Sequence, residues 1–151
     1  MRREEPQLVH AALLGNEEMV RSLVGKGIDV NQPSPSTGLT PLLAALMTEP
    51  NQTNYSQKVS VARLLLRKGA NPNAKDDKGH TALWYAVSFQ KNLVIVRLLL
   101  QKGATNWNDD DAEGDSALAA ARSLDLKEVT TLLEDADQKW KTTLQEVQNP
   151  K

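Results

Sequence analysis

Residues 75–108 hold the pattern that most constrains the fold, KDDKGHTALWYAVSFQKNLVIVRLLLQKGATNWN. In this stretch a glycine turn precedes a short helical segment, a second and more apolar segment, and a further glycine. The plan recurs before and after it: the turn glycines are Gly38, Gly79 and Gly114, and the glycines after the second segments are Gly27, Gly69 and Gly103. Such self-similarity predicts a repeat protein, in which each unit packs only against its neighbours.

The residue types at the repeated positions predict pairs of helices. Thr40 and Thr81 can cap a helix by accepting backbone N–H bonds, and Pro41 stands where its missing N–H costs nothing. The second segments end in VRSLVGKG, ARLLLRKG and VRLLLQKG. Because a leucine stripe buries one face of a helix against the next unit, we expect a short curved stack of helix pairs.

The motif Gly-x-Thr-Pro-Leu, followed by Ala-Ala, a Leu-Leu pair and Gly-Ala-x-x-Asn, resembles the ankyrin repeat. The best matches are GLTPLLAA at residues 38–45, LLLRKGANPNA at 64–74 and GHTALWYA at 79–86. The resemblance covers roughly residues 7–134. It implies an all-α fold: an ankyrin-repeat solenoid of helix-turn-helix units with short hairpin fingertips, plus a C-terminal helix.

We divide the chain into an ankyrin repeat domain at residues 1–134 and a capping or linker helix at 135–151. Ala136, Trp140, Leu144 and Val147 share one face of that last helix, which could cover the final repeat or continue into a longer chain. The four repeats are expected at about 4–32, 35–74, 75–108 and 109–134, with an insert at about 48–57. The helices are expected near 7–14, 17–25, 41–48, 57–68, 82–89, 93–101, 116–124 and 126–134.

The third repeat carries one extra residue around Phe89–Asn92 and has no glycine there. Either Lys91 or Asn92 replaces the glycine that the family has between its helices. Since asparagine tolerates the left-handed conformation better than most residues, we predict that Asn92 adopts it.

Composition excludes several classes of protein. The net charge is −1, which favours neither nucleic acid nor an anionic membrane as partner, and the chain has no cysteine. The N-terminus does not read as a signal peptide, and there is no apolar run long enough to span a membrane. His10 and His80 stand on different repeats, and no catalytic or metal-binding constellation is present. We expect a monomeric cytoplasmic or nuclear domain without a cofactor.

The family resemblance implies that fingertip residues and the ends of the first helices line a concave binding face. Met47, Phe89 and Leu124 would then form an exposed apolar strip, unless they tuck under a neighbouring repeat or the insert. The predicted partner-binding residues are Leu39, Met47, Asp77, Lys78, His80, Trp84, Ser88, Phe89, Trp107, Glu113, Asp115 and Leu124.

Two tryptophans depart from the family pattern. Trp84 occupies the usual histidine position of the Thr-Pro-Leu-His motif, where packing is favoured over binding. Trp107 occupies a position where Asn31 and Asn73 follow the family. An exposed fingertip tryptophan would either pack on the insert or meet a partner.

Charges are segregated along the repeats. Arg21, Arg63 and Arg97 share one repeat position, and Lys26, Lys68 and Lys102 share another, so basic stripes should run along the second-helix side. A solvated face is the simpler interpretation of these stripes, and an anionic partner is the alternative. Residues 109–115 carry five acids and no base, which could steer a partner with a basic segment.

Two functional hypotheses follow. The first is a non-catalytic protein–protein interaction module whose concave face, centred on repeats two and three, binds a peptide or folded partner. The alternative is a regulatory small-anion-binding ankyrin domain of a larger enzyme or channel, in which Trp84 or Trp107 stacks on the ligand near Lys78. A stand-alone enzyme is disfavoured because no catalytic constellation is present.

Overall fold

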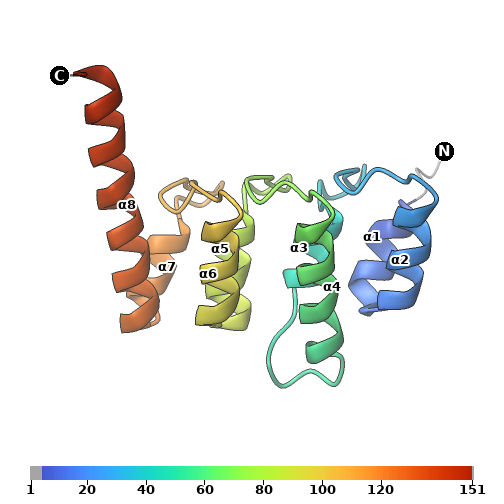
Figure 1. The fold of residues 1–151 in the computed structure, drawn as a ribbon. Coiled ribbons are helices and arrows are strands. Elements are labelled where there is room, and N and C mark those ends of the chain that lie inside the picture. Colours follow the sequence, from blue (N-terminus) through green and yellow to red (C-terminus); the bar gives the residue numbers. More distant parts are fainter. Residues whose placement is uncertain (1–4, 151) are drawn as a thin grey trace.

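The structure, a computed structural model, describes residues 5–150 as a row of stacked helix pairs (Figure 1). The first helix of each pair packs against the first helix of the next, from α1 through α3 and α5 to α7. The expected all-α solenoid is confirmed. The elements are α1 (Gln7–Leu14), α2 (Glu17–Gly25), α3 (Pro41–Leu46), α4 (Tyr55–Arg67), α5 (Ala82–Tyr85), the π-helix η1 (Ala86–Gln90), α6 (Leu93–Gln101), α7 (Ala117–Ser123) and α8 (Lys127–Gln148).

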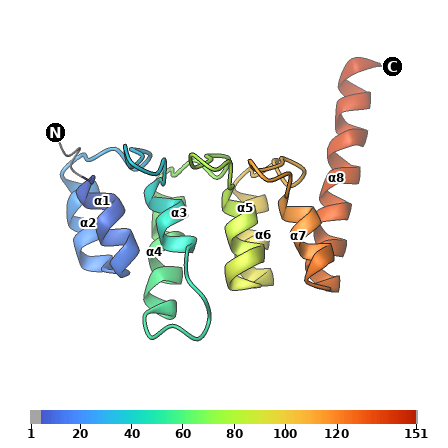
Figure 2. The ribbon, with the colours of Figure 1, turned by 180° about the vertical axis from the view of Figure 1, so that it is seen from behind.

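The two layers of helices face opposite sides of the molecule. The second helices, α2, α4, α6 and α8, face the reader in Figure 1, and the first helices face the reader in Figure 2, which shows the opposite side. The turns that precede α3, α5 and α7, here called the fingertips, lie along one long edge of the stack. No helix within residues 5–150 is long and apolar enough to cross a membrane.

Hydroxyl side chains start α3, α5 and α7, as predicted for Thr40 and Thr81, whereas α1 follows Pro6 and has no side-chain cap. Thr40 accepts a bond from the backbone N–H of Leu43, and Thr81 accepts one from Trp84. Ser116 caps α7 in the same way. These caps satisfy N–H groups that have no partner within their helix, so they set the residue at which α3, α5 and α7 begin.

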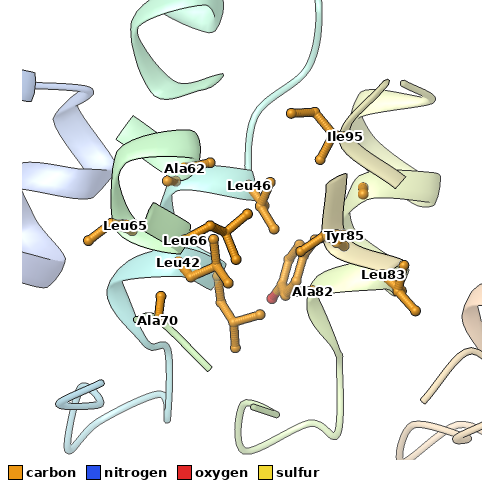
Figure 3. Packing of buried hydrophobic residues seen from close by; sticks show 14 of the residues in the cluster. Leu42, Leu46, Ala62, Leu65, Leu66, Ala70, Ala82, Leu83, Tyr85 and Ile95 are labelled. Atoms are coloured by element: carbon orange, nitrogen blue, oxygen red, sulfur yellow. The ribbon is translucent and has the colours of Figure 1, made fainter. Parts of the chain in front are cut away.

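The core is aliphatic and continuous between the second and third pairs (Figure 3). Leu46 of α3, Leu65 of α4 and Ile95 of α6 are fully buried, and Tyr85 of α5 is 5% exposed. Since each pair leaves a leucine face uncovered on its own, the neighbouring pair completes its core.

Asparagines tie successive repeats together on the loops after the second helices. Asn73 donates through Nδ2 to the carbonyl of Gly103 at 3.0 Å and accepts at Oδ1 from the N–H of Thr105 at 2.9 Å. Asn31 makes the equivalent contacts with Gly69 and Asn71. The asparagine position is therefore a link from one repeat to the loop of the next.

The insert forms a loop on the long edge of the stack opposite the fingertips (Figures 1 and 2). Helix α3 stops at Leu46, two residues earlier than expected, and α4 begins at Tyr55, two residues earlier than expected. The buried side chain of Lys58, in the first turn of α4, donates to the carbonyl of Met47 at 2.8 Å. Burial lowers the pKa of Lys58 below its ordinary value.

The C-terminal helix is not a separate element. Helix α8 runs unbroken from Lys127 to Gln148, and only its first part packs on α6 and α7, through the buried Val129 and Leu133. The rest passes the fingertips and extends beyond them (Figure 1). Trp140, Leu144 and Val147 are 45%, 41% and 72% exposed, so this face does not cover the final repeat.

The prediction for Asn92 was wrong. Lys91 adopts the left-handed conformation, with φ of 48°, and Asn92 instead caps α6. Its Oδ1 accepts from the backbone N–H of Val94 at 2.9 Å, and its Nδ2 donates to the hydroxyl of Tyr55. The sequence carried the signal, because Lys91-Asn92 aligns with Gly15-Asn16, where Gly15 is left-handed and Asn16 is the cap.

Candidate functional site

A groove of about 420 Å³ lies between the second and third helix pairs, beside their fingertips. The first helices contribute apolar and aromatic side chains to it, and the fingertips contribute mostly polar ones. Its lining residues are Ser36, Thr37, Leu39, Met47, Asp76, Asp77, Lys78, His80, Trp84, Tyr85 and Phe89. A concave surface with an apolar wall and a polar rim suits an apolar side chain presented on a peptide backbone.

Three aromatic rings of α5 and η1 pack against one another to form one wall of the groove. Trp84 and Tyr85 meet edge to face with centroids 5.2 Å apart. Phe89 lies 5.6 Å from Tyr85 and 6.0 Å from Trp84. These separations are typical of favourable aromatic pairs, so the wall is a preformed surface.

The extra residue of the third repeat accounts for the position of Phe89. A single added residue in a helix is commonly absorbed as a π-turn, and η1 is such a turn. Gln90 is buried at its end and donates through Nε2 to the carbonyl of Leu46, which ties η1 to α3. Phe89 of η1 and Met47 at the end of α3 thereby line the same groove.

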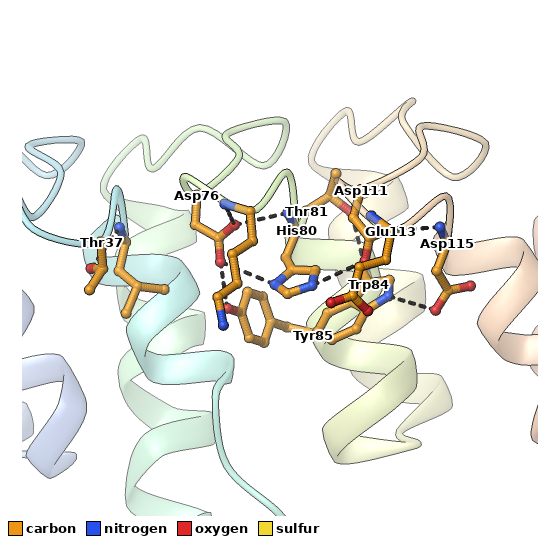
Figure 4. Close-up of polar contacts among 11 residues, drawn as sticks. Thr37, Asp76, His80, Thr81, Trp84, Tyr85, Asp111, Glu113 and Asp115 are labelled. Carbon is orange, nitrogen blue, oxygen red and sulfur yellow. Dashed lines mark hydrogen bonds and ion pairs between the residues drawn. The ribbon is translucent and has the colours of Figure 1, made fainter.

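His80 is held between two aspartates from neighbouring fingertips (Figure 4). Its Nε2 lies 3.1 Å from Oδ2 of Asp111, and its Nδ1 lies 3.3 Å from Oδ2 of Asp76. The imidazole stacks on the indole of Trp84, with centroids 3.7 Å apart and planes at 11°. Nδ1 makes no hydrogen bond within residues 5–150 despite its short distance to Asp76, so the contact with Asp111 and the stacking on Trp84 hold the ring against the groove wall.

Asp76 organises the third fingertip from within. Its Oδ1 accepts from the backbone N–H groups of Lys78 and His80, both at 2.9 Å, and its Oδ2 accepts from the Tyr85 hydroxyl at 2.6 Å. Burial, together with this bond to a carboxylate, raises the pKa of Tyr85 well above its ordinary value. The Tyr85 phenol therefore stays a neutral hydrogen-bond donor at physiological pH.

Asp111 repeats this arrangement in the fourth fingertip. Its Oδ1 accepts from the backbone N–H groups of Asp115 and Glu113. The Asp115 bond is the main cause that lowers the pKa of Asp111, and His80 lowers it further. Asp115 in turn accepts from Nε1 of Trp84 at 3.1 Å, so the fourth fingertip supports the aromatic wall from behind.

The fingertips also join through their backbones. Asp77 N–H donates to the carbonyl of Thr37, and Ala112 N–H donates to that of Lys78. Gly38, with φ of 73°, permits this approach: a Cβ there would lie 2.7 Å from the backbone nitrogen of Asp77. The rim of the groove is consequently built on a continuous, closely packed row of turns.

The structure brings together many of the predicted partner-binding residues. Seven of them line the groove, namely Leu39, Met47, Asp77, Lys78, His80, Trp84 and Phe89. Ser88 and Glu113 lie outside it, and Asp115 acts through its bond to Trp84. Leu124 is 42% exposed at the end of α7 and does not line the groove, so the expected apolar strip does not extend to it.

The expectation of an exposed Trp107 was wrong. Its side chain is 4% exposed, and its Nε1 donates to Oδ1 of Asp137 in α8 at 3.0 Å. The insert lies on the opposite edge of the stack and does not cover Trp107. Burial of Trp107 and the stacking of Trp84 on His80 leave little basis for the ligand-stacking alternative.

Asp76 and Tyr85 were missed as site residues. A signal for Asp76 exists in the sequence, since DDKGH and DAEGD place an aspartate three residues before Gly79 and Gly114. Tyr85 follows Trp84 in the repeat that has an extra residue. The sequence alone could not predict how that extra residue orients the Tyr85 ring. Within residues 5–150 no group of three or more potential metal ligands gathers.

Comparisons with known proteins agree with the repeat pattern. Residues 52–143 match the family model described as ankyrin repeats (3 copies), and residues 8–52 match the one described as ankyrin repeats (many copies). A protein of Treponema pallidum named for its ankyrin repeats is 37% identical over 108 residues, which are 72% of this chain and 33% of that protein.

Two further relatives are much longer than this chain. Rabankyrin-5 of Mus musculus is 31% identical over 99 residues, which are 64% of this chain and 8% of that protein. The phosphocholine transferase AnkX of Legionella pneumophila is 27% identical over 128 residues, which are 82% of this chain and 12% of that protein. The chain thus spans about a third or less of the length of these relatives.

Proposed function

Because the chain belongs to the ankyrin repeat family, we propose that it is a non-catalytic protein-interaction module that binds a peptide segment of a partner in the groove between α3 and α5. The observation that carries this proposal is the groove itself, about 420 Å³ with an aromatic wall and a polar rim. An apolar side chain of the partner would fill it between Met47 and Phe89, and the partner's backbone would meet the fingertips.

Preorganisation supports this mode of binding. The rings of Trp84, Tyr85 and Phe89 already pack together, and His80 lies between the carboxylates of Asp76 and Asp111. A surface that is ordered before binding loses little conformational entropy on association. Rigid aromatic anchors are also the residue types that most often dominate interface energy.

The charge at the rim favours a partner with a basic flank. Asp77 is exposed at the rim, and the next fingertip adds Asp110 and Glu113, which are also exposed. Lys75 already pairs with Asp109 at 2.8 Å, and Lys78, which lines the groove, offsets only one of these three acids. A lysine or arginine beside the apolar anchor of the partner would therefore be attracted to the third and fourth fingertips.

A selection from a random peptide library displayed on phage tests the proposal. Peptides enriched on the wild-type protein should share an apolar residue with a neighbouring basic one. Met47→Glu, which places a charge in the groove, should weaken those peptides by at least about tenfold. The matched control is Leu124→Glu, an equivalent change at an exposed leucine outside the groove, which should leave their affinity unchanged.

Two outcomes would count against the groove. Peptides that bind Met47→Glu as tightly as wild type would place the interaction elsewhere. Failure to enrich any peptide on the folded wild-type protein would remove the peptide-binding proposal.

A further inference from the structure

The second-helix side of the molecule carries an uncompensated group of cations. Residues 55–68, which include α4, contain the exposed cations Arg63, Arg67 and Lys68 beside the buried Lys58 and no acid, and residues 91–103, which include α6, contain three further cations and no acid. The whole chain has a net charge of −1, so the balancing acids lie elsewhere, notably on the fourth fingertip. The second-helix face of the two central repeats is therefore strongly basic.

These cations surround a hollow of about 310 Å³ between α2, α4 and α6. Arg63 and Arg67 are one helical turn apart, so they project from the same face of α4. Lys102 comes from the end of α6, and Leu98 adds an aliphatic surface. Ser60 and Glu17 complete the lining.

The cations in the hollow have no ionic partners within residues 5–150. Arg21, Lys75, Arg122 and Lys141 form ion pairs in this part of the chain, whereas Arg63, Arg67 and Lys102 form none. The one acid of the hollow, Glu17, is engaged by Arg21 at 2.6 Å. The hollow thus keeps its positive charge.

A bound anion would relieve this arrangement. Like charges on adjacent turns of a helix repel one another, and guanidinium groups bind carboxylates through two parallel hydrogen bonds. Leu98, which is partly buried against the core, adds an aliphatic surface beside the cations and favours a ligand that is not purely ionic. Since the chain as a whole is slightly acidic, long-range attraction to a polynucleotide is weak.

We propose that this hollow binds an acidic peptide segment of a partner protein, in which carboxylate side chains flank an aliphatic one. The carboxylates would pair with Arg63, Arg67 and Lys102, and the aliphatic side chain would pack on Leu98. The hollow lies on the helix layer opposite the α5 and η1 groove, so both surfaces can be occupied at once and each can be tested without the other.

Fluorescence anisotropy with a labelled, acetylated Glu-Asp-Leu-Asp-Glu peptide tests the proposal. At about 50 mM salt the peptide should bind, and binding should weaken at about 300 mM because the charges are then screened. Arg67→Gln and Lys102→Gln should each weaken binding at least about fivefold, and the double substitution more. Replacing the central leucine of the peptide with glycine should also weaken it.

Arg122→Gln is the matched control. It removes the same charge from an arginine outside the hollow that is already paired with Glu134, so affinity should not change. The proposal would be overturned by an absence of binding at peptide concentrations up to about 1 mM. An equal loss in Arg122→Gln would also overturn it, as would tighter binding of a twelve-residue oligothymidylate through the same residues, since that would mark a general polyanion surface.

Discussion

The indole N–H of Trp107 donates to Oδ1 of Asp137 at 3.0 Å, joining the loop after α6 to the final helix α8. At the equivalent position of earlier repeats, Asn31 and Asn73 bind the loop of the next repeat. The last repeat has no such loop, because α8 continues without a glycine stop. A buried tryptophan in place of asparagine therefore fits a repeat whose neighbour is a long helix.

We predict that Trp107→Ala detaches the middle of α8 from the stack. Removing a buried tryptophan typically costs about 3–5 kcal/mol of unfolding free energy. Trp107→Phe keeps most of the ring and loses the bond to Asp137, for which we expect about 1–2 kcal/mol. Urea unfolding followed by circular dichroism measures both, and hydrogen exchange should show faster exchange across α8.

Asp135→Ala serves as the control for this helix. Asp135 is exposed in the same helix and its side chain makes no hydrogen bond or ion pair within residues 5–150, so the change should stay within about 0.5 kcal/mol. If Asp135→Ala and Trp107→Ala were equally destabilising, the role assigned to the Trp107–Asp137 bond would be wrong.

Acid should weaken the docking of α8. Bonds from Lys141 and Trp107 lower the pKa of Asp137 below its ordinary value of 3.8. A lowered pKa in the folded state means that the ionised carboxylate stabilises the fold above the ordinary pKa, and that this contribution is lost as the pH falls through the folded pKa. The difference in unfolding free energy between wild type and Asp137→Asn should therefore be constant from about pH 7 to 5 and shrink below about pH 4. A difference that stays constant down to pH 3, measured by urea unfolding, would contradict this account.

Most of the fold could be predicted because its determinants are local and repeated. Thr40 and Thr81 cap helices that follow a turn glycine, and the second helices α2, α4, α6 and α8 each bury at least one leucine in the core. The continuous α8 was missed even though the fourth repeat lacks the glycine that ends earlier second helices. A missing stop signal is weaker evidence than a present one.

The candidate site was only partly predictable. Met47 and Phe89 fall at equivalent ends of first helices, so their meeting in one groove follows from the repeat geometry. The brace formed by Asp76, His80 and Asp111 depends on side-chain directions in two fingertips, which periodicity does not specify. Burial of Trp107 likewise required knowing that α8 passes beside it.

Gly38→Ala should destabilise the rim of the groove. Alanine at φ of 73° is strained by about 1–2 kcal/mol, and its Cβ would also lie 2.7 Å from the backbone nitrogen of Asp77. We expect a loss above about 2 kcal/mol of unfolding free energy, measured by urea unfolding, together with weaker peptide binding. Gly69→Ala separates the two causes, because Gly69 has φ of 91° but no atom within 4 Å of the position that a methyl group would occupy, so it should cost only the backbone strain. Equal losses in the two variants would show that contact between fingertips contributes little.

The junction between η1 and α6 offers a stabilising substitution. Lys91 adopts φ of 48°, which strains a residue that has a Cβ, whereas Lys91→Gly removes this strain. We expect a net gain of about 0.5–1 kcal/mol, because the relief of about 1–2 kcal/mol exceeds the entropy that glycine loses on folding.

Asn92→Gly is the matched comparison one residue along the chain. It removes the side chain that caps α6 and bonds to Tyr55, so it should lose stability by at least a few tenths of a kcal/mol. Opposite signs for the two glycine substitutions in thermal unfolding would establish that Lys91 holds the strained position, and a gain from Asn92→Gly would reverse the assignment.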